Sequence, residues 1–428
     1  MMDHIGSRRA CHERDVLCMR GPSFSGDLSA MGSNQTTGKD TSAAVEQSGA
    51  APFQTGRVIG LALCHFINDV YTSFLSPLLP LLIQKLSMSL TQAGFLSTVL
   101  QVPSLLNPYI GVLADRVSVR YFIIAAPTLT AVPMSLIGLA PTYGVLLILL
   151  FVTGISVSIF HVPAPVMISR ISGNRVGRGM SFYMAGGEVA RTLGPLAAIG
   201  AVSFFGLEGF YPVMVFGLIA SIWLFLGFKD IPIDRPGKKR EGSIGKAWHE
   251  ARPVLGPLVA ILFARGFMHA SMATFLPTFI EGETGSLWLG GMALTIFQTA
   301  GVLGVLGSGS MSDYFGRRRV LFFSLLAAPL GLLMFLRLEG WFRFAALLFT
   351  GLTLLSTTPV MLAMVQERAI KNPAAANGLF MMISFVARSA IVVLVGFVGD
   401  MLGLRATYII SCLLGFLGIP FIFLLPRK

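Results

Sequence analysis

The stretch GSGSMSDYFGRRRV, residues 307–320, has a second copy in the same chain, GVLADRVSVR at residues 111–120. Each copy places an aspartate four residues after a glycine and follows it with arginines. The later copy is the more complete, and its defining residues are Gly309, Asp313, Gly316, Arg317 and Arg318. The earlier copy keeps Asp115 and Arg116 but lacks the second glycine. A polar motif that occurs once in each half of the chain indicates a duplicated architecture.

Long apolar segments flank both copies of this motif. Of the 428 residues, 54% are hydrophobic and only 12% are charged, and the mean hydropathy is +0.75. Soluble globular chains carry about 25% charged residues. The apolar residues come in blocks long enough to cross a hydrocarbon core of about 30 Å. The sequence therefore predicts an all-α polytopic membrane protein.

We expect twelve transmembrane helices in two bundles of six. The expected spans are 57–84, 91–114, 119–139, 143–170, 177–205, 209–228, 254–280, 287–312, 318–337, 341–367, 375–400 and 404–425. The predicted domains are a disordered cytoplasmic tail (1–56), an N-terminal bundle (57–228), a basic cytoplasmic linker (229–253) and a C-terminal bundle (254–428).

Basic residues are concentrated in alternate loops. The loops after the even-numbered spans carry most of the loop arginines and lysines, whereas the opposite loops carry Lys85, Arg337, Arg343 and Arg405. Because basic loops stay in the cytoplasm, we expect both termini on the cytoplasmic side of an inner membrane. The net charge of +12 is explained by this distribution, so nucleic acid is not an expected partner.

The two halves also match outside the loops, at an offset of 197 residues. Leu79-Pro80 recurs at Leu276-Pro277, Gln101 at Gln298, and the tripeptide VAR at 189–191 recurs at 386–388. Parallel repeats of this kind place a substrate site near the membrane midplane, between the halves.

The paired loop motifs resemble the signature of the major facilitator superfamily. The resemblance implies a gating role for Asp115, Arg116, Asp313, Arg317 and Arg318, in which the aspartate pairs with arginines and helix ends on the cytoplasmic side. A purely topological role is the alternative for these residues.

Two further stretches resemble the fosmidomycin-resistance branch of that superfamily. They are HFINDVYTSFLSPLLPLL (65–82) and GGEVARTLGPLAA (186–198). That branch tends to have His-Pro-Glu at the end of span 4, where this chain has His161-Val162-Pro163 and no acid. A lone histidine there is expected to bond to a backbone carbonyl freed by proline.

Span 1 carries a stripe of polar residues at helical spacing. Its members are His65, Asn68, Asp69, Thr72 and Ser76. Polar groups inside a membrane usually face the bundle interior, so the stripe contacts either substrate or a neighbouring helix. We assign Asn68 to substrate binding, and Asp69 and His65 to proton coupling.

The intramembrane arginines predict an anion site. Arg191 and Arg388 are equivalent in the repeat, and Arg265 and His269 occupy the places of Asn68 and Thr72 in the second half. Guanidinium groups suit a carboxylate, phosphate or phosphonate. The predicted substrate-binding residues are Arg191, Arg388, Arg265, His269, Gln101, Gln298 and Asn68. The alternative is that each arginine is neutralised internally.

Glu188 lies three residues before Arg191, so the two side chains can pair on one helix face. It has no acidic counterpart at 385–386, where Phe-Val stands. Substrate capture of Arg191 would release Glu188 to take a proton, which makes Glu188 the first candidate for coupling.

These patterns predict a secondary transporter that works by alternating access, not an enzyme. No nucleotide-binding loop is present and no cofactor or metal site is expected, so a proton gradient is the predicted energy source. We expect efflux of a small anionic or amphipathic compound by a monomer in a lipid bilayer. Uptake or exchange of an organic anion is the first alternative, and a non-transporting membrane sensor is a remote one.

Overall fold

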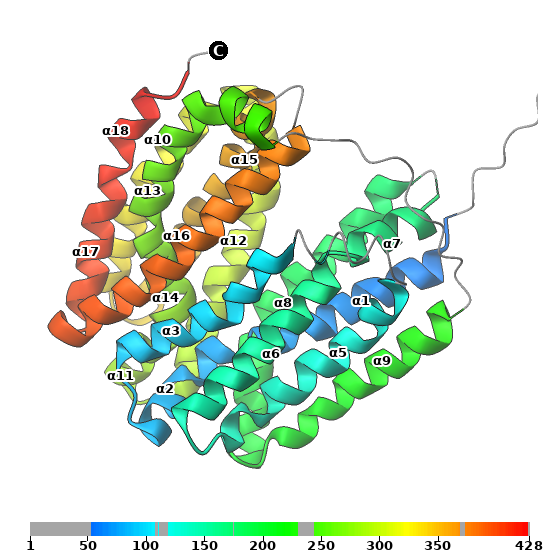
Figure 1. Ribbon diagram of the computed structural model, residues 1–428. Coiled ribbons are helices and arrows are strands. Elements are labelled where there is room, and N and C mark those ends of the chain that lie inside the picture. Colours follow the sequence, from blue (N-terminus) through cyan, green and yellow to red (C-terminus); the bar gives the residue numbers. More distant parts are fainter. Residues whose placement is uncertain are drawn as a thin grey trace, which may run out of the picture. The chain divides into compact units, whose positions relative to one another are not determined.

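The computed structural model describes residues 53–107, 110, 119–173, 175–229, 244–368 and 373–426. All of them belong to one structural unit, residues 50–428. Its described part is built of helices that run back and forth (Figure 1).

The helices of the N-terminal half are α1 (Thr55–Thr72), α2 (Leu75–Leu86), α3 (Leu90–Gln101), η1 (Val102–Leu106), α5 (Val119–Leu136), η2 (Ile137–Leu139), α6 (Tyr143–His161), α7 (Ala164–Ile171), α8 (Val176–Phe205), η3 (Tyr211–Met214) and α9 (Val215–Phe228).

The helices of the C-terminal half are α10 (Ile244–Ala270), η4 (Ser271–Phe275), α11 (Leu276–Thr284), α12 (Leu287–Phe315), α13 (Arg317–Arg337), α14 (Gly340–Leu355), α15 (Thr357–Arg368), α16 (Pro373–Leu402), α17 (Leu404–Leu417) and α18 (Ile419–Phe423).

Ten of the twelve predicted spans coincide with described helical segments that are long and apolar enough to cross a membrane. The other two coincide with α3–η1 and with α8, whose 30 residues are sufficient in length. One boundary differs from expectation, because α10 begins at Ile244 and takes up the last ten residues of the segment expected to be linker.

Spans 1 and 7 are interrupted at equivalent places. The α1–α2 break lies at Ser73–Phe74, and α10 passes into α11 through a wider helical turn, η4. Pro277 has no N–H, so it cannot bond to the carbonyl of Ala273 one turn earlier. The Ser76 hydroxyl of the other half donates to the oxygens of Ala273 and Thr274 at 2.9 and 2.8 Å. Ser76 thus supplies a hydrogen-bond donor to the carbonyl that lacks one because of Pro277, and this bond links the two halves.

The halves meet at the end of the bundle that carries the α2–α3 turn, hereafter the α2–α3 end. There α3 lies beside α16 and α2 beside α11 (Figure 1). One hydrophobic cluster contains buried residues of both halves, among them Leu79, Ala93, Ile391 and Val392. The core therefore continues across the boundary at this end.

Helix capping and small residues hold this contact together. Asp400, in the last turn of α16, accepts bonds from the N–H groups of Leu90 and Thr91 at 2.6 and 2.8 Å. A carboxylate at a helix N-terminus satisfies open donors and complements the helix dipole. A Cβ atom on Gly396 would lie 2.3 Å from the Leu90 oxygen, and one on Gly94 would lie 2.6 Å from the Val392 oxygen. Only glycine permits the backbones to approach so closely.

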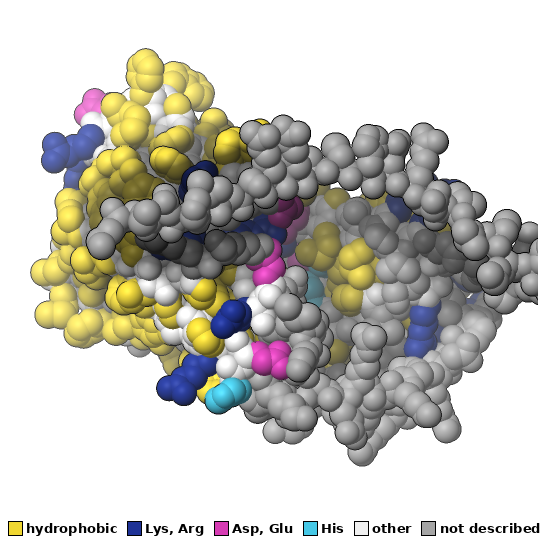
Figure 2. All heavy atoms as spheres, turned by 90° about the horizontal axis from the view of Figure 1, so that it is seen from above, with side chains coloured by type: hydrophobic (Ala, Val, Ile, Leu, Met, Phe, Trp, Pro, Cys, Tyr) yellow, Lys and Arg dark blue, Asp and Glu magenta, His cyan; other side chains and the backbone are white. Residues whose placement is uncertain are grey.

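The opposite end carries the α12–α13 turn at Gly316, whose φ of +89° favours glycine. Figure 2 looks down onto the molecule from above, and shows charged side chains of both signs near the middle of this face. Hydrophobic side chains cover its flank on the left.

Candidate functional site

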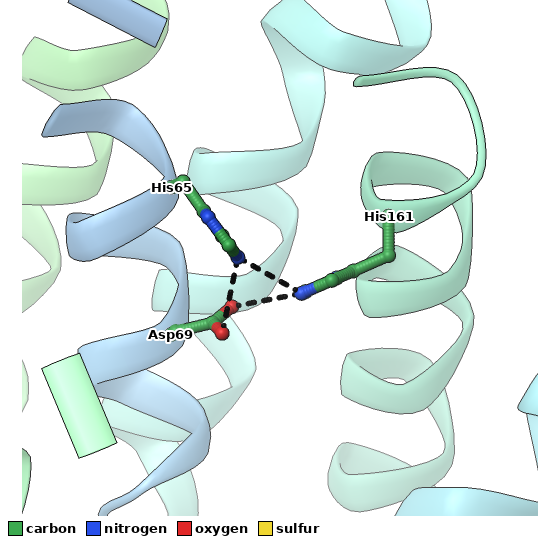
Figure 3. Close-up of side chains that lie close together, drawn as sticks. All are labelled: His65, Asp69 and His161. Carbon is green, nitrogen blue, oxygen red and sulfur yellow. Dashed lines mark hydrogen bonds and ion pairs between the residues drawn. The ribbon is translucent and has the colours of Figure 1, made fainter. Parts of the chain in front are cut away.

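The first polar group in the membrane interior is a cluster of two histidines and an aspartate. His65 and Asp69 lie one turn apart on α1, and His161 is the last residue of α6. The three side chains point toward one another (Figure 3). The Nε2 atoms of the histidines are 3.2 Å apart, and each lies 3.3 Å from an oxygen of Asp69. His161, which the sequence places alone, is therefore part of a three-residue cluster.

The backbone orients both histidine rings. His65 Nδ1 lies 2.7 Å from the Tyr183 carbonyl oxygen, and His161 Nδ1 lies 3.0 Å from that of Val157. His161 thus bonds to a backbone carbonyl as expected, but not to one that proline frees, because the carbonyls one turn before Pro163 and Pro165 belong to Ile159 and His161. In addition, the Tyr183 ring stacks on the His65 ring at 4.0 Å. Each ring consequently presents its Nε2 atom to Asp69.

A buried network supports the aspartate. Asn68 donates to Asp69 Oδ1 at 3.1 Å and accepts from the Thr130 hydroxyl at 2.8 Å, which lies 2.7 Å from the Ser156 hydroxyl. Asn68 is fully buried, so in this conformation its amide positions Asp69. Its assignment to substrate binding stays a prediction, as do the coupling roles of Asp69 and His65.

Two glycines of the GGEVARTLGPLAA stretch allow α8 to pack against α1. A Cβ atom on Gly186 would lie 2.4 Å from the Ala62 oxygen. One on Gly187 would lie 2.6 Å from Cε1 and 2.9 Å from Nε2 of His65. Gly187 therefore keeps open the space that the His65 ring occupies.

The next two polar residues of α8 form the predicted ion pair. Arg191 Nη2 lies 2.5 Å from Glu188 Oε1, and both side chains are partly exposed. The charge of Arg191 also acts on Arg388 in the other half. The repeat-related arginines are thus close enough to interact electrostatically.

Arg265, His269 and Arg388 line one small cavity in the C-terminal half, between α10 and α16. Its volume is about 70 Å³, and the described residues that line it include no aspartate or glutamate. Arg265 is 6% exposed. Its Nη2 donates to the Leu354 oxygen at 3.2 Å, while its buried Nε has no partner within the described residues.

Such an arrangement favours an anion. Buried charges are normally paired, because an unpaired one is costly to remove from water. Arg388 is exposed and lies over the Phe385 ring, 5.9 Å from its centroid. The cavity thus combines a buried guanidinium, an exposed one and an imidazole, with no counter-charge among the lining residues that the structure describes.

The two symmetric glutamines lie apart from this cavity's lining. Gln101 donates to the Ser97 carbonyl at 3.2 Å, and its buried Oε1 has no partner among the described residues. Gln298 is half-buried on α12. Their assignment to substrate binding stays a prediction.

The complete signature motif is organised around Arg317 at the start of α13. Arg317 pairs with Asp313 and also with Glu367 on α15, the latter at 3.1 Å. Arg318 donates to the Phe423 oxygen at 3.3 Å. These bonds tie together α12, α13, α15 and α18 within the C-terminal half. Asp115 and Arg116 lie outside the described residues, and a gating role for either copy stays a prediction.

Comparison with known proteins identifies the family. The family model described as Major Facilitator Superfamily matches residues 61–307 and 283–428. The chain belongs to this superfamily. Its family and fold place it among membrane transporters rather than enzymes.

Two bacterial relatives of this transporter are similar over nearly their whole length. The fosmidomycin resistance protein of Escherichia coli (strain K12) is 25% identical over 376 residues, covering 85% of this chain and 91% of the relative. The uncharacterized MFS-type transporter YfnC of Bacillus subtilis (strain 168) is 28% identical over 402 residues, covering 89% and 95%.

The fold of this transporter also matches solved structures. A bacterial homolog of the human lysosomal transporter Spinster, in an inward-facing and occupied conformation, aligns with a TM-score of 0.77 at 14% identity. The alignment covers 88% of this chain and 97% of that one. At this identity the likeness shows the fold.

Proposed function

We propose that the protein is a secondary active transporter that exports a small anionic or amphipathic compound in exchange for protons. The observation that carries this proposal is the cavity of Arg265, His269 and Arg388, whose described lining contains no acidic residue. A carboxylate, phosphate or phosphonate would supply the missing negative charge, and arginine can bind such groups with two hydrogen bonds. The cavity suits the charged group of the substrate rather than a whole drug-sized molecule.

Arg191 adds a binding group from the other half. Since Arg191 and Arg388 repel each other, an anion between them removes that repulsion and favours their approach. Substrate binding would in this way bias the relative position of the two halves, which is what alternating access requires.

Glu188 is the proposed carrier of the coupling proton. In this structure its carboxylate is held by Arg191. An anion that captures Arg191 removes this partner, and an acid that loses a cationic partner binds a proton more readily. Anion binding and protonation of Glu188 would thereby be linked.

Two observations support the proposed orientation in the membrane and the proposed direction of transport. Concentration of basic residues at the α12–α13 end favours a cytoplasmic location for that end, with both termini on the same side of an inner membrane. The resemblance to the fosmidomycin resistance protein favours export. Uptake or exchange of an organic anion uses the same cavity and is the alternative. We further propose that the protein acts as a monomer.

A flux assay tests this proposal. The purified protein is reconstituted into liposomes, and uptake of phosphonates, carboxylates and uncharged analogues is measured with and without an imposed pH gradient. We expect anions to move only with the protein present, and against their own gradient when protons flow the other way. Equal rates for charged and uncharged analogues would refute the anion assignment. Transport of anions without response to the pH gradient would refute coupling.

The bond between the halves at Ser76 gives a test of alternating access. Replacing Ser76 by alanine removes a hydrogen bond worth about 1 kcal/mol, so the ratio of the two states is expected to shift about fivefold. Spin labels at Pro141 and Trp341, which are exposed near the α2–α3 end in different halves, report their distance. We expect a larger population at long distance than in the parent. Ser203→Ala, an exposed site on α8, is the control, and identical distributions in both variants would contradict the prediction.

A further inference from the structure

The three side chains in Figure 3 bring two ring nitrogens and one carboxylate together. Carbonyl oxygens only accept hydrogen bonds, so the Nδ1 atoms of His65 and His161 must carry the ring protons that face Tyr183 and Val157. In the neutral rings both Nε2 atoms then carry a lone pair and can only accept a hydrogen bond. They face each other and the Asp69 carboxylate at 3.2–3.3 Å. Such a group requires either a proton on one Nε2 atom or a metal ion between the three side chains.

The spacing of these atoms fits a metal ion. Zinc binds imidazole nitrogen at about 2.0–2.1 Å and carboxylate oxygen at about 2.0–2.2 Å, so neighbouring ligand atoms of a tetrahedral site are about 3.3–3.5 Å apart. Hydrogen bonds between a charged donor and a carboxylate are shorter, about 2.7–2.9 Å. The observed separations of 3.2–3.3 Å are closer to those between metal ligands, with Oδ2 of Asp69 beside His65 and Oδ1 beside His161.

The surroundings also match those of metal ligands. A ligating histidine usually donates its other ring N–H to a carbonyl or carboxylate, which fixes its tautomer and orientation. Both histidines do so here, and Asn68 orients Asp69 in the same manner. The Asp69 side chain is 9% exposed and that of His161 is 35% exposed, so an ion could enter beside His161.

We propose that His65, Asp69 and His161 form a binding site for a divalent transition-metal ion of the zinc type. The ligands are the two Nε2 atoms and the Asp69 carboxylate, whose Oδ2 lies 3.3 Å from His65 and whose Oδ1 lies 3.3 Å from His161. The remaining position is open beside His161. Two imidazoles with a carboxylate favour zinc over magnesium or calcium, which prefer oxygen ligands alone. The charge of Arg191 acts on His161 and opposes a cation, but Glu188 neutralises Arg191 at 2.5 Å. Metal binding here uses none of the residues that line the anion cavity in the other half.

Equilibrium metal binding tests the proposal on the full-length protein in detergent. Four residues of the N-terminal tail, His4, His12, Cys11 and Cys18, are replaced by alanine or serine so that they do not bind the ion. The stripped protein is dialysed against buffered micromolar zinc, and bound zinc is counted by mass spectrometry. We expect one ion per chain and, with cobalt in its place, the intense visible absorption of a tetrahedral site.

Substitution of the ligands should remove the ion. We expect His161→Ala and Asp69→Asn to abolish binding at micromolar zinc, whereas His249→Ala, an exposed histidine of α10, retains it. Gly187→Ala leaves every ligand in place but pushes on the His65 ring, so its affinity is expected to fall about 10- to 100-fold. Unfolding temperatures measured without metal show that each variant is folded.

Two results would overturn the proposal. One is wild-type protein that binds no more zinc than the His161→Ala variant. The other is one ion per chain that persists in folded Asp69→Asn and His161→Ala proteins. In the first case the cluster holds a proton only. Neither result affects the anion assignment, which is judged by flux of charged and uncharged analogues.

Discussion

Replacing Glu188 by glutamine is expected to abolish proton-driven transport while leaving anion binding intact. Glutamine keeps the size of the side chain but cannot take up a proton. The variant also frees Arg191 from an ion pair that is partly exposed, and such pairs are worth about 0–1 kcal/mol. Anion affinity is therefore expected to rise, by about fivefold at most. Flux with an imposed pH gradient and equilibrium binding of the same anion measure the two effects.

The matched control for this variant is Glu208→Gln. Glu208 lies in the loop between α8 and η3, where hydrogen bonding from Lys85 and its charge hold the pKa of the carboxyl below its ordinary value. Its side chain is 70% exposed, so we expect coupling to be unchanged there. If Glu188→Gln responds to the pH gradient as the parent does, the coupling role of Glu188 is wrong.

Replacing Arg265 by methionine is expected to weaken anion binding without loss of stability. A hydrogen bond to a charged group is worth about 1.5–3 kcal/mol, so affinity for a phosphonate or carboxylate should fall about 10- to 100-fold. The Nε atom of the buried guanidinium has no partner in the part of the chain that the structure describes, and an apolar side chain of similar length removes that unfavourable burial. The Leu354 oxygen still accepts from the Thr357 hydroxyl at 2.7 Å. We therefore expect an unchanged or higher unfolding temperature.

Comparing the binding of a charged compound with that of its uncharged analogue distinguishes a role of Arg265 in anion binding from a role in the fold. Equal loss for the two compounds, or a lower unfolding temperature, would show that Arg265 serves the fold instead. Arg337→Gln, an exposed arginine in the last turn of α13, controls for the loss of one positive charge.

Features that depend on one helix or on the repeat could be predicted from the sequence. Helical spacing alone places Glu188 beside Arg191, and the 197-residue offset relates Arg191 to Arg388. The family, the helical membrane fold and membrane transport follow from such patterns together with the loop motif. All three are confirmed by the comparisons.

The cluster at His161 could not be predicted in this way. Its contact with His65 joins residues 96 positions apart, and depends on how closely α8 packs on α1 at Gly187. The same is true of Ser76, whose partner oxygens lie in the other half. The one signal in the sequence is that spans 1 and 4 each carry a histidine. Helical spacing relates residues of one helix only, so it does not indicate that these two histidines meet.

Because α3 and α16 contact each other through glycines, a single substitution there can change how the two halves are arranged. Because a Cβ atom on Gly396 would already overlap the Leu90 oxygen, replacing Gly396 by leucine would push α3 and α16 apart at the α2–α3 end. The two halves would then have to separate at that point while staying in contact elsewhere. One substitution about two turns from Arg388 on the same helix, outside the lining of the anion cavity, would thus supply a trapped form for structural work without changing a residue of that cavity or of the histidine cluster.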